Sequence, residues 1–216
     1  MLLQLALDAL SREKAHHLAG RLSGMVDIVE VGTPLLLRYG LEIVSEIKNL
    51  GGGKPIFADA KIVDAGGYET EMVLEGGASM VSVLAGASLK TLREARETCS
   101  RRGAKLVVDT IDLEVPPPSK IRELRAIGPD YVVLHLPSDL AQEGKSWKTF
   151  FESSPFLAEP FAFMVAGGLR KELLSEVLSL LKPQIVVVGS AVTASPTPEE
   201  ELRLFREVLH EFYRKS

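Results

Sequence analysis

The sequence predicts an α/β protein whose 216 residues form a single (β/α)8 (TIM) barrel domain spanning residues 1–216. Short apolar runs alternate with amphipathic stretches along the whole chain, which is typical of a strand–helix repeat. The repeat count reaches eight with no segment left over, and polar residues end many of the apolar runs. A doubly wound open sheet shares the alternation, but these last two features favour the barrel.

The expected strands are short and rich in Val, Ile and Leu, with little alternation of apolar and polar residues. This pattern is typical of parallel strands buried on both faces. In chain order they are Leu2–Asp8, Val26–Val31, Pro55–Asp59, Met80–Leu84, Lys105–Asp109, Tyr131–His135, Phe161–Val165 and Gln184–Val188. The first run has no basic segment before it and soon reaches Asp8, so we expect a buried strand rather than a signal peptide.

Segments with helical periodicity lie between the strands. The expected helices are Arg12–Leu22, Leu35–Leu50, Tyr68–Glu75, Leu89–Arg101, Ser119–Ile127, Asp139–Phe151, Lys171–Leu181 and Glu199–Arg214. Thr33-Pro34 predicts a capping residue followed by proline at the first helical position, and Thr197-Pro198 repeats this signal. Glycines such as Gly103 are expected to end helices before the next strand.

The composition excludes several classes of protein. A net charge of −4 and a pI near 5.7 argue against nucleic acid as a partner, because phosphate binding needs a basic surface. No apolar run approaches the ~20 residues that span a bilayer, so no membrane partner is expected. A single cysteine, Cys99, excludes an internal disulfide and a cysteine metal cluster. We therefore expect a cytoplasmic protein.

Ionisable side chains stand at the carboxyl ends of five expected strands: Asp8, Glu30, Asp59 with Lys61, Asp109 and His135. In a barrel these strand ends meet at one mouth, and charges are rare inside an apolar barrel unless they are paired, metal-bound or catalytic. Each residue alone could be a helix cap or a loop carboxylate, and the histidine could be a satisfied core residue. Five strands ending this way predict a functional site.

The most informative segment is Asp59-Ala-Lys61-Ile-Val-Asp64. Asp59 and Lys61 are two residues apart, so an extended chain points both side chains to the same face. This array suits holding a cation beside an enediolate oxygen, while Asp64 can cap the next helix or reach a neighbouring site. A salt-bridge cluster with a capping aspartate is the structural alternative.

Two glycine-containing loops, at Gly167-Gly168 and Gly189-Ser190, follow the seventh and eighth expected strands. In (β/α)8 barrels the loops after these strands usually hold phosphate through backbone N–H groups and a helix N-terminus. A single Gly-Gly pair would be an ordinary turn. Loops of this kind at both positions predict a phosphorylated small molecule as the ligand.

These segments together resemble the 3-hexulose-6-phosphate synthases. The resemblance rests on Leu5–Asp8, Val29–Pro34, Ala58–Gly67 and the two glycine loops, which occur in order over nearly the whole chain. More broadly, the sequence is similar to the orotidine 5′-monophosphate decarboxylase suprafamily, which includes the 3-keto-L-gulonate-6-phosphate decarboxylases. The resemblance implies a homodimer of (β/α)8 barrels with active sites at the subunit interface.

The resemblance also implies a role for each catalytic residue. Glu30 and Asp59 would bind Mg²⁺, Lys61 would stabilise the enediolate, and His135 would be the acid/base. Asp64 would be offered to the partner subunit's site. Asp59 and Mg²⁺ are expected to keep the lysine charged, which disfavours Schiff-base chemistry because an imine-forming amine needs a lowered pKa.

Substrate binding is assigned by the same resemblance. Asp8 and Asp109 would contact substrate hydroxyl groups, and the phosphate would be held by Gly167, Gly168, Gly189 and Ser190. Asp109, Ser138 and Ser190 match the synthases better than the keto-gulonate decarboxylases, which carry Glu, Arg and Arg there. Leu136-Pro137 and Ala85 depart from the synthase pattern.

The synthase branch implies an aldehyde-lyase that reversibly condenses formaldehyde with D-ribulose 5-phosphate to D-arabino-hex-3-ulose 6-phosphate. The alternative enzyme is a 3-keto-L-gulonate-6-phosphate decarboxylase, in which CO₂ rather than formaldehyde leaves C1. The alternative from another class is a non-catalytic sugar-phosphate-binding barrel. Binding phosphate alone requires none of Glu30, Asp59, Lys61 and His135, so their presence favours an enzyme.

Overall fold

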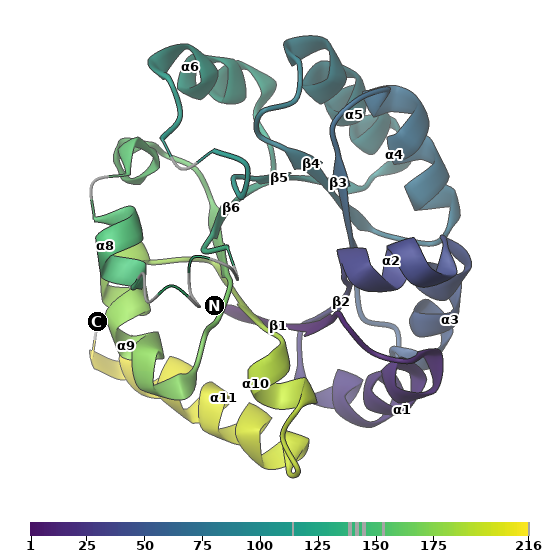
Figure 1. The fold of residues 1–216 in the computed structure, drawn as a ribbon, viewed down its shortest axis with the longest axis vertical. Coiled ribbons are helices and arrows are strands. Elements are labelled where there is room, and N and C mark those ends of the chain that lie inside the picture. The colour runs from purple at the N-terminus through teal and green to yellow at the C-terminus, as the bar shows by residue number, and fades with distance from the viewer. Residues whose placement is uncertain (114, 138–139, 141–142, 144–145, 153, 216) are drawn as a thin grey trace.

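The computed structural model describes residues 1–113, 115–137, 140, 143, 146–152 and 154–215. Within this part of the chain, parallel strands close into a barrel in chain order, and Figure 1 shows the ring that they form inside a layer of helices. The strands are β1 (Leu2–Leu7), β2 (Ile28–Val31), β3 (Ile56–Ile62), β4 (Met80–Leu84), β5 (Lys105–Asp109), β6 (Tyr131–His135), β7 (Phe163–Ala166) and β8 (Ile185–Val188). The predicted (β/α)8 fold class is confirmed.

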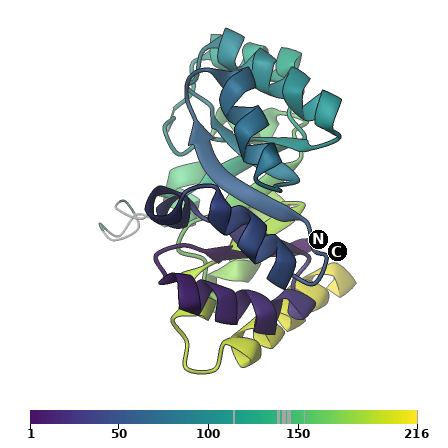
Figure 2. The ribbon, with the colours of Figure 1, turned by 90° about the vertical axis from the view of Figure 1, so that its right-hand side faces the viewer.

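Helices follow the strands around the outside of the ring (Figures 1 and 2). The α-helices are α1 (Arg12–Leu22), α2 (Thr33–Tyr39), α3 (Glu42–Leu50), α4 (Gly66–Glu75), α5 (Leu89–Arg102), α6 (Pro118–Ile127), α8 (Trp147–Phe151), α9 (Lys171–Leu181), α10 (Ser190–Thr193) and α11 (Pro198–Lys215). Two 3₁₀ turns lie at Ser23–Met25 and Pro155–Ala158. None of the described helices is long and apolar enough to cross a membrane.

The single helix expected over Leu35–Leu50 is wrong. Gly40 has φ of +67° and ends α2, and a new helix, α3, starts at Glu42. A glycine in this conformation breaks the helical hydrogen-bond ladder, although the apolar periodicity continues across it.

The expected capping role of Thr33 is also wrong, because Gly32 is the N-cap of α2 and Thr33 is its first residue. The threonine hydroxyl instead donates to Asp59 Oδ2 at 2.9 Å and to the Asp59 carbonyl at 2.7 Å. The helix expected at Asp139–Phe151 falls partly outside the described residues, and α8 covers its final five residues. Ser138, one of the branch-indicating positions, also lies outside them.

The barrel strands are buried on both faces, as predicted. Outward-facing side chains such as Leu3, Leu5 and Val186 pack against the helices in one large apolar cluster. Inward-facing side chains form a second cluster that fills the middle of the barrel: Ala6, Ile28, Phe57, Met80, Val107, Val133, Met164, Ala166, Ile185 and Val187. The polar strand ends therefore stand on a packed apolar plug, in a position where water reaches them from one side only.

Candidate active site

The predicted strand-end residues come together at the carboxyl end of the barrel. Asp8 follows β1, while Glu30, Asp59, Asp109 and His135 lie on β2, β3, β5 and β6. On these strands they continue the inward-facing rows of the plug, since side chains two residues apart share a face. Glu30 is 6% exposed, Asp59 7% and Asp109 2%, so these carboxylates are almost wholly removed from water.

Strand β3 reaches further than its expected end at Asp59, because it continues through a bulge to Ile62. Its register against β4 shifts between Ala58 and Ile62, and Lys61 within the bulge has φ of +49°. The Lys61 N–H donates to Ser82 Oγ at 2.8 Å instead of to a strand carbonyl. This left-handed conformation is rare for a non-glycine residue, and such strain clusters at functional sites. The bulge aims the lysine into the mouth.

Lys61 Nζ lies between two carboxylates, 2.6 Å from Asp59 Oδ2 and 2.9 Å from Asp109 Oδ2. Burial alone would lower the pKa of Lys61, but Asp109 and Asp59 outweigh it and raise that pKa above its usual value. The ammonium is therefore fixed in its charged form, which agrees with the expectation that this lysine does not form a Schiff base.

Asp109 joins the lysine to the histidine. His135 Nδ1 lies 3.1 Å from Asp109 Oδ2. Burial would raise the pKa of Asp109, but the hydrogen bonds and charges of His135 and Lys61 hold it at about 2. An ionised carboxylate can only accept, so Nδ1–H donates to Asp109 and Nε2 is the ring nitrogen left to exchange a proton with a ligand.

Two further carboxylates, Glu30 and Asp8, crowd against Asp59 at the mouth. Burial, followed by the charges of Asp59 and Asp8, raises the pKa of Glu30 well above its ordinary value. Burial and the charge of Asp59 also raise the pKa of Asp8. The Gln4 amide donates to Glu30 Oε2 at 2.6 Å, while Gln4 Oε1 is buried with no hydrogen-bond partner in the described chain.

This donor set fits a hard divalent cation. Its atoms are oxygens, its carboxylates repel one another, and Gln4 Oε1 lacks a partner. The described residues contain no group of three or more His, Cys, Asp or Glu side chains that would enclose a metal alone. Mg²⁺ is commonly held by one or two carboxylates, with waters and substrate oxygens completing its octahedron. Glu30 and Asp59 could therefore hold Mg²⁺ at the open end of the barrel.

Glycines make room for this cluster. A Cβ at Gly32 would lie 1.9 Å from Asp8 Oδ1, so only glycine lets the aspartate occupy its position. Gly167 has φ of +107°, and a Cβ there would lie 2.0 Å from the Leu136 carbonyl oxygen. Gly189 is the N-cap of α10, which starts at Ser190. The glycine loops therefore bring backbone N–H groups to the rim, where the first N–H groups of α10 have no helical partner.

Residues 1–205 match the model of the orotidine 5′-phosphate decarboxylase / HUMPS family. The chain belongs to this family. It is 33% identical to the 3-hexulose-6-phosphate synthase of Bacillus subtilis over 212 residues, which cover 97% of this chain and 99% of the relative.

Solved structures of the orotidine 5′-phosphate decarboxylase / HUMPS family have the same fold. The 3-hexulose-6-phosphate synthase from Salmonella typhimurium matches with a TM-score of 0.88 and 32% identity, over 98% of this chain and all of the other. The 3-keto-L-gulonate-6-phosphate decarboxylase from Vibrio cholerae matches with a TM-score of 0.85 over 98% of both chains, at 20% identity. At that identity the second match bears on the fold alone.

One predicted site residue of this family member stays apart from the others. Asp64 follows β3, is exposed, and makes no hydrogen bond or ion pair with any described residue. The capping alternative is wrong, because Ala65 is the N-cap of α4 and no side chain caps that helix. Within one barrel, Asp64 therefore has no part in the Lys61 cluster.

Sequence reasoning missed three polar residues that support the cluster of this family member: Gln4, Thr33 and Ser82. Ser82 Oγ donates to Asp59 Oδ1 at 2.8 Å and accepts the Lys61 N–H, so it fixes both residues. Gln4 holds Glu30, and Thr33 holds Asp59. Gln4 and Ser82 are polar residues within otherwise apolar buried strands, and each lies two residues from an inward-facing apolar residue, Ala6 and Met80 respectively.

Proposed function

We propose that this protein is a lyase of the aldehyde-lyase class that condenses formaldehyde with D-ribulose 5-phosphate to D-arabino-hex-3-ulose 6-phosphate, reversibly. The observation that carries the proposal is the linked row Asp59–Lys61–Asp109–His135 beside Glu30. It occurs in a chain that is 31–33% identical over nearly its whole length to relatives named 3-hexulose-6-phosphate synthase.

The sugar phosphate would bind with its phosphate at the glycine loops, near the backbone N–H groups of Gly168 and Ser190. Asp8 and Asp109 would accept hydrogen bonds from its hydroxyl groups. Glu30 and Asp59 would hold Mg²⁺, which when bound supplies Lewis acidity toward the ketose oxygens. The phosphate end and the reacting end would thus be fixed at opposite sides of the mouth.

His135 Nε2 would remove a proton from C1 of ribulose 5-phosphate, leaving an enediolate. General base help of this kind typically contributes roughly 10²–10⁴-fold. The Lys61 ammonium would stabilise the negative oxygen, since it is fixed in place and in charge before the reaction begins. C1 of the enediolate would then attack the formaldehyde carbon, and the new alkoxide would take up a proton to give the product.

The active form would be a homodimer in which Asp64 completes the partner's site. Asp64 stands beside a surface rich in exposed apolar side chains: Leu37 at 84% exposure, Tyr68 at 72%, Val63 at 57% and Met72 at 41%. These residues lie on α2, which packs beside β3, and on the segment that leads from β3 through α4 (Figure 1). Apolar patches of this kind usually mark association surfaces.

A reducing compartment suits the chain. Its single cysteine, Cys99, is buried, and burial raises the pKa of its thiol to about 11. Such a thiol is an inert core residue. We place the enzyme in the cytoplasm.

The test is formaldehyde consumption by purified protein with ribulose 5-phosphate and Mg²⁺, beside an EDTA-treated sample and the Lys61→Ala variant. We expect formaldehyde loss only with sugar phosphate and metal together, and none with Lys61→Ala, which should still bind the metal. Folded protein without this activity would overturn the synthase proposal. CO₂ release from 3-keto-L-gulonate 6-phosphate would then identify a decarboxylase.

A further inference from the structure

A cavity lies at the other end of the barrel, where the strands begin. Its volume is about 650 Å³, within the range of roughly 300–1,000 Å³ that small-molecule sites occupy. The first residues of six successive strands line it: Leu2, Ile28, Ile56, Met80, Lys105 and Tyr131. The apolar plug separates it from the carboxylate cluster, so it is not part of the site described above.

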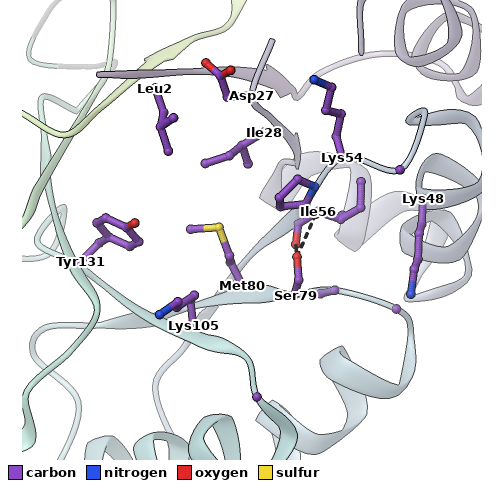
Figure 3. Close-up of a pocket in the computed structure, with 15 residues that line it drawn as sticks. Leu2, Asp27, Ile28, Lys48, Lys54, Ile56, Ser79, Met80, Lys105 and Tyr131 are labelled. Carbon is purple, nitrogen blue, oxygen red and sulfur yellow. Dashed lines mark hydrogen bonds between the residues drawn. The ribbon is translucent and has the colours of Figure 1, made fainter. Parts of the chain in front are cut away.

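The centre of this cavity is apolar. Figure 3 shows Leu2, Ile28, Met80 and Tyr131 arranged around the open space, with the ring of Tyr131 across from Ile28. Ile28 and Met80 are the outermost members of the plug and are almost fully buried. Leu2 is 39% exposed at the mouth. A flat or branched apolar group entering here would remove the exposed surface of Leu2 and Tyr131 from water, at roughly 25 cal/mol per Å² buried.

The charges around the cavity do not cancel. Asp27 is already used, because its Oδ2 accepts from Arg206 at 3.1 Å and from the Leu3 N–H at 2.8 Å. Lys105 is likewise paired, with Asp130 at 2.8 Å. Lys48 and Lys54 line the cavity and have no acidic partner within 4.0 Å among the described residues.

The exposed side chain of Lys48 runs over the rim. A Cβ at Gly77 would lie 3.0 Å from its Cδ and 3.6 Å from its Nζ, so the lysine stem lies across this glycine. Ser79, next to the same rim, uses its hydroxyl on the Ile56 backbone and offers no competing acid (Figure 3). Lys48 and Lys54 lie on one side of the hollow with their ammonium groups pointing apart (Figure 3). Two uncompensated cations beside an apolar hollow attract a ligand with one anionic group and one apolar body.

We propose that this cavity is a binding site for a small organic anion, with an apolar body between Leu2, Met80 and Tyr131 and its acidic group on the side of Lys48 and Lys54. The ligand class is an aromatic or branched carboxylate rather than a sugar phosphate, because the Tyr131 hydroxyl is the one polar group on the four side chains around the cavity centre and could not pair with the several hydroxyl groups of a sugar. Ile28 and Met80 lie two residues before Glu30 and Ser82 on the same inward rows, so the ligand would bear on two strands that carry the cluster above.

The test uses the intact protein labelled with ¹³C at its methionine methyl groups, titrated with 2-naphthoate. The sequence has five methionines, and Met80 can be followed beside Met72, which is exposed on α4 and does not line the cavity. We expect a saturable shift of the Met80 methyl signal and none at Met72. The neutral analogue 2-naphthalenemethanol should bind at least about tenfold more weakly. Inorganic phosphate alone should not move Met80.

Reversing the charge of the two lining lysines distinguishes a specific binding site from a general attraction of the anion to positive charge on the protein. Lys48→Glu/Lys54→Glu should weaken 2-naphthoate binding at least about tenfold. The control Lys14→Glu/Lys90→Glu changes the net charge equally at exposed positions on α1 and α5, and should leave binding unchanged. Leu2→Trp, which fills the mouth, should abolish it. An unmoved Met80 signal, equal binding of the neutral alcohol, or equal loss in both charge variants would overturn the proposal.

Discussion

Lys61 combines three unusual properties at one residue: a left-handed backbone, a partly buried ammonium and two carboxylate partners. The backbone conformation depends on Ser82, which accepts the Lys61 N–H while its own hydroxyl holds Asp59. A single small hydroxyl group therefore sets the relative positions of the proposed catalytic cation, Lys61, and the proposed metal ligand, Asp59. Residues of this kind act through their neighbours and need not touch substrate.

Ser82→Ala should lower both stability and metal affinity. It leaves a buried N–H without an acceptor, which costs about 1–3 kcal/mol in the free energy of unfolding. It also frees Asp59, and loss of such a supporting contact typically reduces metal affinity by about 10–100-fold. Urea denaturation and calorimetric Mg²⁺ titration would measure the two effects. Ser45→Ala, at an exposed helical position, is the matched control and should change neither.

Glu30 should destabilise the metal-free fold at neutral pH. Its folded-state pKa is raised above the ordinary value of 4.5, so the folded protein binds its proton more tightly than the unfolded chain. Stability therefore falls as pH rises from below about 4.5 through the folded-state pKa. Glu30→Gln removes the ionisable group, so in EDTA at pH 7 the variant should have a higher Tm than the unsubstituted protein. Near pH 4 the Tm difference between the two should disappear. Thermal melts across this range would check the prediction, and a lower Tm at pH 7 would contradict it.

The same substitution should abolish catalysis, because a proposed metal ligand is lost. Several kcal/mol of transition-state stabilisation correspond to at least about a hundredfold in rate. Mg²⁺ should raise Tm of the unchanged protein and have a much smaller effect on Glu30→Gln. Glu30 would then lower the stability of the metal-free protein while being required for its activity.

At the scale of elements, close backbone approaches fix how helices pack around the strands. Gly66 opens α4, and a Cβ there would lie 2.0 Å from the Thr91 carbonyl oxygen on α5. Because the obstacle is backbone, the helix itself would have to move. Since α4 directly follows the β3 bulge and Asp64, its position also sets where that segment emerges.

Gly66→Ala should therefore destabilise the fold by about 1–3 kcal/mol, the usual cost of overpacking. Gly20→Ala is the matched control, because Gly20 lies in α1 with no atom within 4 Å of an added Cβ. It should stabilise the protein by roughly 0.5–1 kcal/mol through helix propensity. Urea midpoints of the two variants should move in opposite directions, and equal shifts would show that the α4–α5 contact is unimportant.

The helices and strands also show which parts of the fold can be predicted from the sequence. Runs of apolar residues identify buried parallel strands, so β4, β5 and β6 have the predicted bounds. The bulge in β3 could not be predicted, because it depends on Ser82, which is distant in sequence. Nor could the break at Gly40, since the apolar period of α2 and α3 runs through it. The shared face of Asp59 and Lys61 was predicted, although the backbone that achieves it is left-handed rather than extended.

For the whole molecule, the question is whether one barrel suffices for activity. Asp64 has no partner within its own described chain, and the surface around it is apolar and exposed. If it completes a second subunit's site, Lys61→Ala and Asp64→Ala should each be inactive alone. Mixed dimers of the two would contain one intact site, so random reassembly should restore up to about one quarter of the normal activity.

Co-refolding of the two variants followed by the formaldehyde assay measures this complementation. If Asp64 acted in its own barrel, every site in the mixture would lack one residue and no activity would return. A Leu37→Glu substitution in both chains provides a further check, because a charge on the exposed apolar surface should prevent pairing and the recovery with it.

The apolar plug has a kinetic consequence. The middle of the barrel is closed by apolar side chains, among them Phe57, Val107, Val133 and Met164. The proposed active site is therefore open at one end only. Whatever enters must leave by the opening through which it came. The hexulose phosphate product therefore has to depart before the next ribulose 5-phosphate can arrive. In steady-state measurements the product should be a competitive inhibitor against the pentose phosphate. A change that speeds entry and exit at the mouth should raise the turnover rates of the forward and reverse reactions alike.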